Sequence, residues 1–336
     1  MKLARRIAGA NNLKLILISI FMLGRFFGMG SPDNDSLPAF PLPKDYILGV
    51  DANVAFSADY RINFLNFAMI DDRQDRLFSY YPNLRGALTV GARYKIFRIS
   101  YSFNITTDNE YNFCYGPTRF NSFEMGIKTR FLWLEAYFSR CKGFYYSDQS
   151  ILFPKFSTDS IYPQNNGLSS FEVGLRAKLI FDHDFSMEAA FDYSEIQEKS
   201  AGSFFYTLNP EISNIKSDSL PIIPPIYTPY YSGLNDFRKA TFLSFSNCLG
   251  YGYSLVLGPV NFSNAIAAGP NLQLSFNHGI KVKLPFDLYF KSSLSVNTKN
   301  FYTGAMVSLD VNNHVFGQNN IRKQFLVFSF RMGFRF

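Results

Sequence analysis

The sequence predicts an all-β fold: a single transmembrane antiparallel up-and-down β-barrel of about twelve strands, with short periplasmic turns and long external loops. Apolar and polar residues alternate with period two through most of the chain, which is the pattern of strands with one apolar face. The 38 Phe and 21 Tyr residues favour strands. Tight turns alternate with long polar connections, which is typical of outer-membrane barrels, whereas a soluble sandwich would share only the alternation of residues.

Residues 1–30 have the parts of a secretory signal peptide. Lys2, Arg5, Arg6 and Lys14 are basic, residues 15–23 form an uncharged apolar run, and two glycines follow at residues 28 and 30. The apolar run is far shorter than the roughly 20 residues of a spanning helix, although Arg25 leaves an uncleaved anchor as the alternative. Residues 31–46 then form a Pro-rich periplasmic segment, and residues 47–336 form the barrel.

The net charge of +7 is mostly local to the leading segment. Five of the 33 basic residues precede Ser31, which leaves 28 basic residues against 26 acidic ones. A nearly neutral mature chain is not that of a nucleic-acid-binding protein.

The first strand is predicted from about Ile47 to Leu65. Residues 84–96 then keep their apolar side chains at even positions, and residues 97–105 keep them at odd positions. Because the phase reverses with almost nothing between the two runs, the chain turns there in a tight hairpin. The same reversal near residues 130–132 predicts a second hairpin.

Three further tight turns are predicted, at residues 182–184, 258–259 and 297–300. The first of these joins a strand over residues 171–179 to one over residues 185–193. The long connections between the turns are residues 66–83, 106–119, 141–168, 195–239, 277–285 and 312–323. Five short turns that alternate with six long loops give twelve strands, with both chain ends on the side of the short turns.

The last strand ends the chain on an aromatic residue. Apolar side chains occupy every second position of residues 325–336, including Phe330, Phe334 and Phe336. Strand alternation alone explains most of this pattern, but the terminal Phe336 resembles the signal that the barrel-assembly machinery of Gram-negative bacteria reads.

Several short stretches go beyond this general pattern: YYPN at residues 80–83, YKIFRISYSF at 94–103, KGFYY at 142–146, QEKSAGSFF at 197–205 and LGYGYSLVL at 249–257. Their order and spacing resemble the uncharacterised domain-of-unknown-function 4421 family of secreted Bacteroidota proteins. The resemblance covers roughly residues 60–336. It implies a barrel in the outer membrane, and no known activity or site.

The polar faces of the strands point into the lumen if the apolar faces meet lipid. A basic cluster is then expected near the short turns, made by Arg93, Lys95, Arg98, Lys128, Arg130, Arg176, Lys178, Arg331 and Arg335. Acidic residues are expected on the same faces, at Glu124, Glu135, Glu172, Glu188 and Asp192. Residues 244–275 form a wall of small side chains, which includes Cys248, Gly250, Gly252, Ser254 and Gly269.

Two interpretations of this lumen stay open. A basic periplasmic mouth would favour anionic solutes in a narrow passage. Alternatively, the charges pair across the strands and hold a packed lumen shut, since a barrel of this size permits either. Glycine allows another chain segment to approach closely, so a plug against the small wall is a further hypothesis, with residues 38–43 and 221–231 as candidates.

The sequence offers little chemistry for an enzyme or a metal site. His183 falls in a predicted turn, and His278 and His314 fall in predicted external loops without a nucleophile or metal-ligand motif. A hydrolase site built from those loops is the remaining enzyme hypothesis. Cys114, Cys141 and Cys248 have no ligand spacing, although a disulfide between Cys114 and Cys141 is possible in an oxidising compartment.

These observations predict an outer-membrane protein of a Gram-negative bacterium, with membrane lipid and the assembly machinery as its partners and with no cofactor. Passive or plugged passage of small polar or anionic solutes is the favoured function. A non-conducting structural or partner-binding barrel is the alternative. In that case the Tyr-rich stretches around residues 145–146 and 227–231 would bind a glycan or a protein.

Overall fold

The computed structural model describes residues 46–336, except residues 50–53, 72–75, 106–108, 130, 148–160, 219, 226–227, 229–236, 277–280 and 317–318. The expected signal peptide and the Pro-rich stretch at residues 38–43 lie outside the described residues. None of the described helices is long and apolar enough to cross a membrane.

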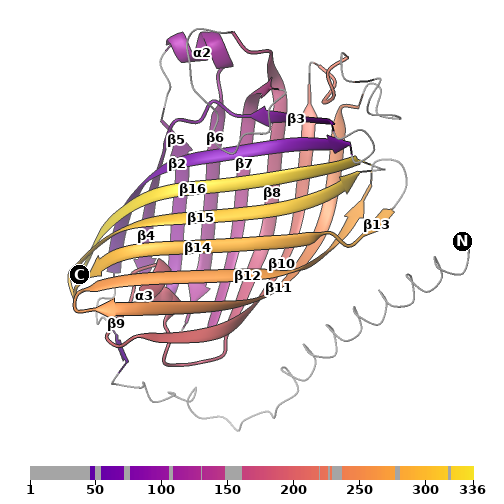
Figure 1. Ribbon diagram of the computed structural model, residues 1–336. Coiled ribbons are helices and arrows are strands. Elements are labelled where there is room, and N and C mark those ends of the chain that lie inside the picture. The colour runs from indigo at the N-terminus through magenta and orange to yellow at the C-terminus, as the bar shows by residue number, and fades with distance from the viewer. Residues whose placement is uncertain are drawn as a thin grey trace, which may run out of the picture. The chain divides into compact units, whose positions relative to one another are not determined.

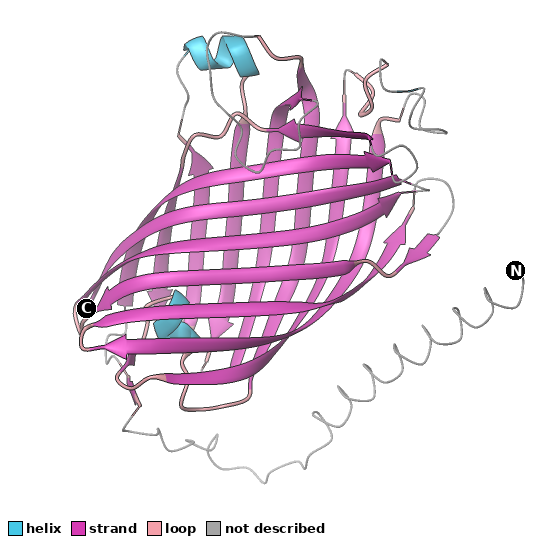
Figure 2. Ribbon diagram, viewed as in Figure 1, coloured by secondary structure: helices cyan, strands magenta, loops and turns pink. Residues whose placement is uncertain are grey.

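Twelve antiparallel strands close into one barrel (Figures 1 and 2). They are β2 (Val54–Asp71), β4 (Ala87–Tyr94), β5 (Phe97–Asn104), β6 (Arg119–Lys128), β7 (Leu132–Ser147), β8 (Gln164–Ile180), β10 (Ala201–Ser217), β11 (Lys239–Leu257), β12 (Val260–Ser275), β14 (Phe286–Asn297), β15 (Phe301–Phe316) and β16 (Asn319–Arg335). The last strand pairs with the first, from Asn320↔Ile70 to Arg335↔Ala55, and so closes the barrel. The predicted fold class and the predicted number of strands are confirmed.

Alternation along each strand separates an apolar outer face from a polar inner face. On β16, Phe328, Phe330 and Phe334 are exposed on the outside, whereas Ser329 and Arg331 are buried inside. A continuous apolar exterior on a closed barrel satisfies the two demands of a bilayer, apolar contact and a fully paired backbone.

The two ends of the barrel differ. At the end that we call the turn end, tight turns join β4 to β5, β6 to β7, β11 to β12 and β14 to β15, as the phase reversals predict. Lys95 and Gly258 adopt positive φ angles of 53° and 61° in two of these turns. The first barrel strand starts at Val54, whereas the short strand β1 (Ile47–Leu48) pairs with β9 (Ile196–Gln197).

The prediction for residues 182–200 is wrong. Residues 185–193 do not form a strand but carry the short helix α3 (Met187–Phe191), and β8 pairs instead with β10. Ser186 starts the helix, because its hydroxyl accepts a hydrogen bond of 2.9 Å from the backbone N–H of Ala189. β10 lies within the predicted external loop 195–239, where Pro210 and many polar side chains conceal the alternation of Phe204 and Ile212 on the outer face.

The opposite end, which we call the loop end, holds β3 (Arg76–Tyr81), α2 (Asn109–Tyr115) and β13 (Lys281–Lys283). β3 pairs with both β2 and β7 across this end (Figure 1). Several predicted loops are shorter than expected because the strands continue past the expected boundaries. His314 therefore lies in β15 and not in a loop.

Candidate functional site in the barrel lumen

A segment between β8 and β10 folds into the turn end of the lumen. We call residues 185–197, which include α3 and β9, the plug. Phe185, Met187, Ala190 and Phe191 of the plug are buried in one apolar cluster with Phe205, Cys248, Ala265 and Ala267 of the barrel wall. The wall of small side chains thus lies where the plug packs.

Glycine is required where the plug approaches this wall. A Cβ atom added at Gly252 would lie 2.9 Å from the ring of Phe185. An added Cβ atom at Gly250 would meet the ring of Phe205 on the neighbouring strand β10. Ser254 of β11 hydrogen-bonds to Ser263 of the adjacent strand β12. At Gly269 an added Cβ would meet the backbone of the neighbouring strand β11 at Asn247. Larger residues at these positions would push the plug or the next strand away.

Hydrogen bonds from the barrel hold the backbone of the plug. The hydroxyl of Ser293 donates to the carbonyl of Ala190 at 2.6 Å, and the side-chain amide of Asn297 donates to the carbonyl of Glu195. Within the segment, the Gln197 side chain accepts from the N–H of Ser186 at 2.9 Å and donates to the carbonyl of Asp184 at 2.7 Å. These bonds satisfy polar groups that would otherwise be buried without partners.

Two arginines of β16 anchor the end of α3. Arg331 forms a bidentate ion pair with Asp59 at 2.6 and 2.7 Å and contacts Asp192 at 3.2 Å. Arg335 donates to the carbonyl of Tyr193 and to the side-chain oxygen of Asn297. The plug therefore neutralises part of the basic cluster with a carboxylate and with backbone carbonyls.

Other members of the basic cluster are also paired. Arg98 forms an ion pair with Asp192. Lys128 lies 3.1 Å from Glu135 and 3.7 Å from Asp192, and Arg176 lies 3.9 Å from Glu135. The turn end is therefore not an open mouth lined with free positive charge. This arrangement corresponds to the interpretation in which the charges pair across the strands and the lumen is packed shut.

The remaining residues of the predicted clusters have different environments. Lys95 is exposed in the β4–β5 turn and does not line the lumen, and Arg130 lies outside the described residues. Arg93 donates to the carbonyl of Lys95 at 3.4 Å. Glu124 accepts a long hydrogen bond of 3.5 Å from Ser100. Glu188 is not on a strand but on α3, where it accepts a hydrogen bond from Ser194.

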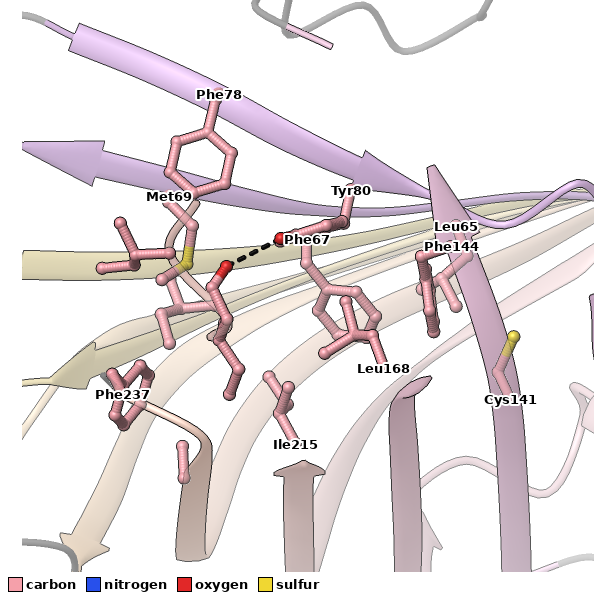
Figure 3. Packing of buried hydrophobic residues seen from close by; sticks show 14 of the residues in the cluster. Leu65, Phe67, Met69, Phe78, Tyr80, Cys141, Phe144, Leu168, Ile215 and Phe237 are labelled. Atoms are coloured by element: carbon pink, nitrogen blue, oxygen red, sulfur yellow. Dashed lines mark hydrogen bonds between the residues drawn. The ribbon is translucent and has the colours of Figure 1, made fainter. Parts of the chain in front are cut away.

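Apolar side chains close the loop end. We call this cluster the cap; it joins Phe67, Phe144, Phe242 and Ile321 of the barrel to Phe78 and Tyr80 of β3 and to Ile222, Ile223 and Phe237 of the β10–β11 connection. Figure 3 shows members of the cluster from different elements close together, among them Phe67, Phe144 and Phe237. The hydroxyl of Tyr80 donates to the carbonyl of Ile222 at 2.8 Å, which fixes the connection over the lumen (Figure 3).

A cavity of about 260 Å³ lies between the plug and the cap. Phe191 of the plug lines it, as do Phe120 and Leu65 near the cap. Its walls are strongly charged, with Arg61, Arg98, Glu124, Lys128, Glu135, Glu172, Arg176, Lys178, Glu211, Asp287, Lys291, Asp310, Lys323 and Arg331. Some of these charges pair across the lumen, such as Lys323 with Glu172.

Several of these cavity residues were not predicted from the sequence, namely Arg61, Glu211, Asp287, Lys291, Asp310 and Lys323, and neither was Asp59, the partner of Arg331. Most lie on strands where the same period-two pattern would have placed them inside, for example Asp287, Tyr289 and Lys291 on β14. Glu211 was missed because β10 was taken for a loop.

Of the residues considered for catalysis or metal binding, His314 and the three cysteines are buried. His314 is buried, shares a hydrogen bond of 2.9 Å with Gln273 and stacks on Phe242 at 4.9 Å, while His278 lies outside the described residues. All three cysteines are buried, and Cys114 and Cys141 form no disulfide. Within the described residues, no group of three metal-ligating side chains is arranged to hold an ion.

The predicted glycan-binding surface at Tyr145 is also not formed. Tyr145 is only 2% exposed, because it packs with Tyr81, Cys114 and Tyr115 in a self-contained cluster under α2. Tyr227, Tyr230 and Tyr231 of the second Tyr-rich stretch lie outside the described residues.

The fold and the lumen define the class of this protein: an outer-membrane β-barrel with a filled lumen. Within that class, residues 46–336 match the family model described as domain of unknown function (DUF4421), and the chain belongs to this family. The resemblance seen in the sequence is thereby confirmed.

Solved structures of outer-membrane proteins are similar to this chain at low identity. The translocator domain of the autotransporter NalP from Neisseria meningitidis is 10% identical, with a TM-score of 0.41 over 85% of this chain and 90% of that one. The outer membrane protease OmpT from Escherichia coli is 6% identical, with a TM-score of 0.35 over 85% of this chain and 97% of that one. These similarities carry no information on function. No match was found among curated protein sequences.

Proposed function

We propose that this protein is a gated channel of the outer membrane, which passes small polar solutes when the plug and the part of the cap on the β10–β11 connection leave the lumen. The proposal includes export through a cleaved signal peptide and insertion by the assembly machinery, which the terminal Phe336 would serve. In this proposal the structure corresponds to the closed state, because the plug fills the turn end and the cap fills the loop end.

The observation that carries the proposal is that the plug takes no part in the barrel's hydrogen-bond ladder. Its only strand, β9, pairs with β1 in a separate two-stranded sheet, whereas β8 pairs directly with β10 beside it. The plug can therefore swing out on its two connections without breaking any pair of barrel strands. A charged cavity of about 260 Å³ behind it favours polar solutes over apolar ones.

Planar-bilayer recordings on three variants test this function. One variant replaces residues 185–198 with a short Gly-Ser linker, a second deletes residues 220–232 of the β10–β11 connection, and the third combines both changes. Because two gates lie in series, we expect little conductance from the wild type, brief openings from each single variant and steady conductance from the combined variant.

The folded state of each variant is checked by heat-dependent migration on gels and by circular dichroism. Steady conductance with a measurable reversal potential also gives the ion selectivity of the lumen. A combined variant that folds and still carries no current would show that the lumen is not a passage. The non-conducting structural barrel would then be the function to pursue.

A further inference from the structure

We propose that the lumen cavity binds a small zwitterionic solute, whose oxyanion lies at Lys178 and Lys291 and whose cationic group lies at Asp287 and Asp310. The inference deepens the proposed function by naming the class of solute, and it rests on that function only for the route by which the solute enters. Six charged side chains face this one cavity without an ion pair to any described residue. Glu124 and Glu211 accept hydrogen bonds from Ser100 and Tyr137, and the proposed site is formed by the other four, two of each sign.

The two lysines define the anionic end of the site. In the part of the chain that the structure describes, neither Lys178 nor Lys291 has a carboxylate oxygen within 4.0 Å. Their Nζ atoms lie against aromatic rings instead, Lys178 at 4.9 Å from the ring centre of Tyr289 and Lys291 at 5.0 Å from that of Phe191. Ring contacts leave the hydrogen-bond donors of an ammonium group available for an oxyanion.

The two aspartates define the cationic end. Asp287 is 5% exposed, and its Oδ1 atom is buried without a hydrogen-bond partner among the described residues. Asp310 lines the same cavity and forms no ion pair with any described residue. Ser246, Asn271 and the backbone of Asn313 hydrogen-bond to the Asp287 carboxylate, but the Oδ1 atom still has no donor. A buried acceptor without a donor is costly, so a ligand that donates a hydrogen bond here would stabilise the protein.

The strand register brings these residues together. Asp287, Tyr289 and Lys291 share the inner face of β14, and Asp310 of β15 lies directly opposite Tyr289. Four residues of strand separate the Cα atoms of Asp287 and Lys291 by about 13 Å.

Lys178 reaches this group across the wall of small side chains. It lies on β8 opposite Thr207 of β10, and Thr207 lies opposite Cys248 of β11. Cys248 and Ala267 are too small to block the long Lys178 side chain, which meets the ring of Tyr289 on β14. The small wall therefore serves the cavity as well as the plug.

The charge balance favours a zwitterion over an anion or a cation alone. Other cations of the cavity already have carboxylate partners, such as Lys323 with Glu172 and Arg331 with Asp59. A simple anion would pair with the two lysines and leave the two aspartates without a cationic partner, and a simple cation would pair with the aspartates and leave the lysines without an anionic one. At about 30 Å³ for each water, the cavity has room for roughly eight waters, which suits a solute of amino-acid size.

Equilibrium unfolding in urea tests the site without requiring any conductance. The folded protein in detergent micelles is titrated with urea while the fluorescence of Trp133 is recorded. Trp133 is the only tryptophan of the chain, and its ring lies 5.5 Å from the Nζ atom of Lys178. The probes are glycine, 4-aminobutyrate and 6-aminohexanoate, which space the two charges differently, and acetate and methylammonium, which each carry one charge.

A ligand that binds only the folded state raises the urea midpoint with its concentration. We expect at least one of the three zwitterions to raise the midpoint more than acetate and methylammonium together. The K178Q/K291Q and D287N/D310N variants are each expected to lose most of this dependence on ligand. The K239Q/K283Q variant, which removes two exposed lysines, is expected to keep all of it.

Equal shifts for all variants, or acetate as effective as the best zwitterion, would overturn the proposal. No shift with any probe would show that the cavity binds no solute of this class, and would overturn it equally. A clear shift in a protein that never conducts would retain the site and reject the channel. Steady conductance without a shift of the urea midpoint would retain the channel and reject the site.

Discussion

Arg331 connects three parts of the molecule at the scale of a single residue. It lies on the last strand, pairs with Asp59 on the first strand and contacts Asp192 at the end of α3. It is 4% exposed, so these contacts form away from water. One side chain therefore joins the closure of the barrel to the position of the plug.

Replacing Arg331 with methionine is expected to destabilise the protein strongly. The change leaves Asp59 and Asp192 buried with fewer positive partners, and breaking a buried ion pair costs about 3–5 kcal/mol. The urea midpoint of the folded barrel in detergent measures the loss. The double variant R331M/D59N should recover part of it, because the uncompensated carboxylate is then gone.

A matched control is Lys216→Met. Lys216 pairs with Asp218 at 2.6 Å, but their side chains are 54% and 48% exposed. An exposed pair of this kind contributes about 0–1 kcal/mol. If R331M lowered the midpoint no more than K216M does, the Arg331 ion pairs would not stabilise the fold.

The period-two pattern places Arg331 on the inner face of its strand without any structure. It does not reveal Asp59, which lies 272 residues earlier in the sequence. That partnership depends on the register of β16 against β2, where Arg331 and Asp59 are directly opposite. Register between the two ends of a chain is set by closure of the whole barrel, and a local pattern contains no information about it.

At the scale of an element, α3 shows how tertiary packing determines the secondary structure of a short segment. Residues 185–193 carry apolar side chains that fit either a strand or a helix, and five helical residues are too few for a stable isolated helix. The helix forms because Ser186 caps it and because Met187, Ala190 and Phe191 have an apolar wall to pack against. Neither condition is visible in the segment alone.

The plug is expected to loosen as the pH rises. Burial raises the pKa of Glu188 above its ordinary value, and the nearby carboxylate of Glu195 raises it further, against the opposing effects of Ser194, Lys128 and Arg93. Because the folded state favours protonated Glu188, its contribution to stability is present below the ordinary pKa. That contribution is lost as the pH rises through the folded-state value.

The urea midpoint of the wild type, measured from about pH 4 to pH 8, should therefore contain a decline that E188Q lacks. Glu198 is exposed just after the plug, so E198Q is the matched control and should behave like the wild type. A pH profile of E188Q that parallels the wild type would contradict the role of Glu188.

At the scale of the whole molecule, the alternation of short turns and long loops was enough to give twelve strands. The count is correct although one strand was misplaced, because β10 takes the position in the barrel that was given to residues 185–193. The alternation of apolar and polar side chains along the strands predicted the barrel. It could not predict that a connection at the turn end folds inward, since this depends on the space that small residues leave in the opposite wall.

The outer face of the barrel is expected to tolerate charge according to depth in the bilayer. Phe328 lies near the middle of β16 and faces outward, so F328R should cost about 2–4 kcal/mol in lipid bilayers. Leu257 faces outward at the turn end of β11, so L257R should cost only about 0–1 kcal/mol.

Urea unfolding from bilayers measures both costs, and the same variants in detergent micelles should differ much less. Equal costs for F328R and L257R in bilayers would mean that the membrane does not cross the barrel at the middle of its strands.

The small sheet of β1 and β9 connects the plug to the part of the chain that precedes the barrel. Ile47 and Leu48 pair with Gln197 and Ile196, and the N–H of Glu198 donates to the carbonyl of Tyr46 at 2.7 Å. A tension applied to the chain before β1 is therefore transmitted first to Gln197, whose side chain holds Ser186 at the start of α3. A molecule that binds the segment ahead of β1 and pulls on it would therefore displace the plug without having to enter the lumen.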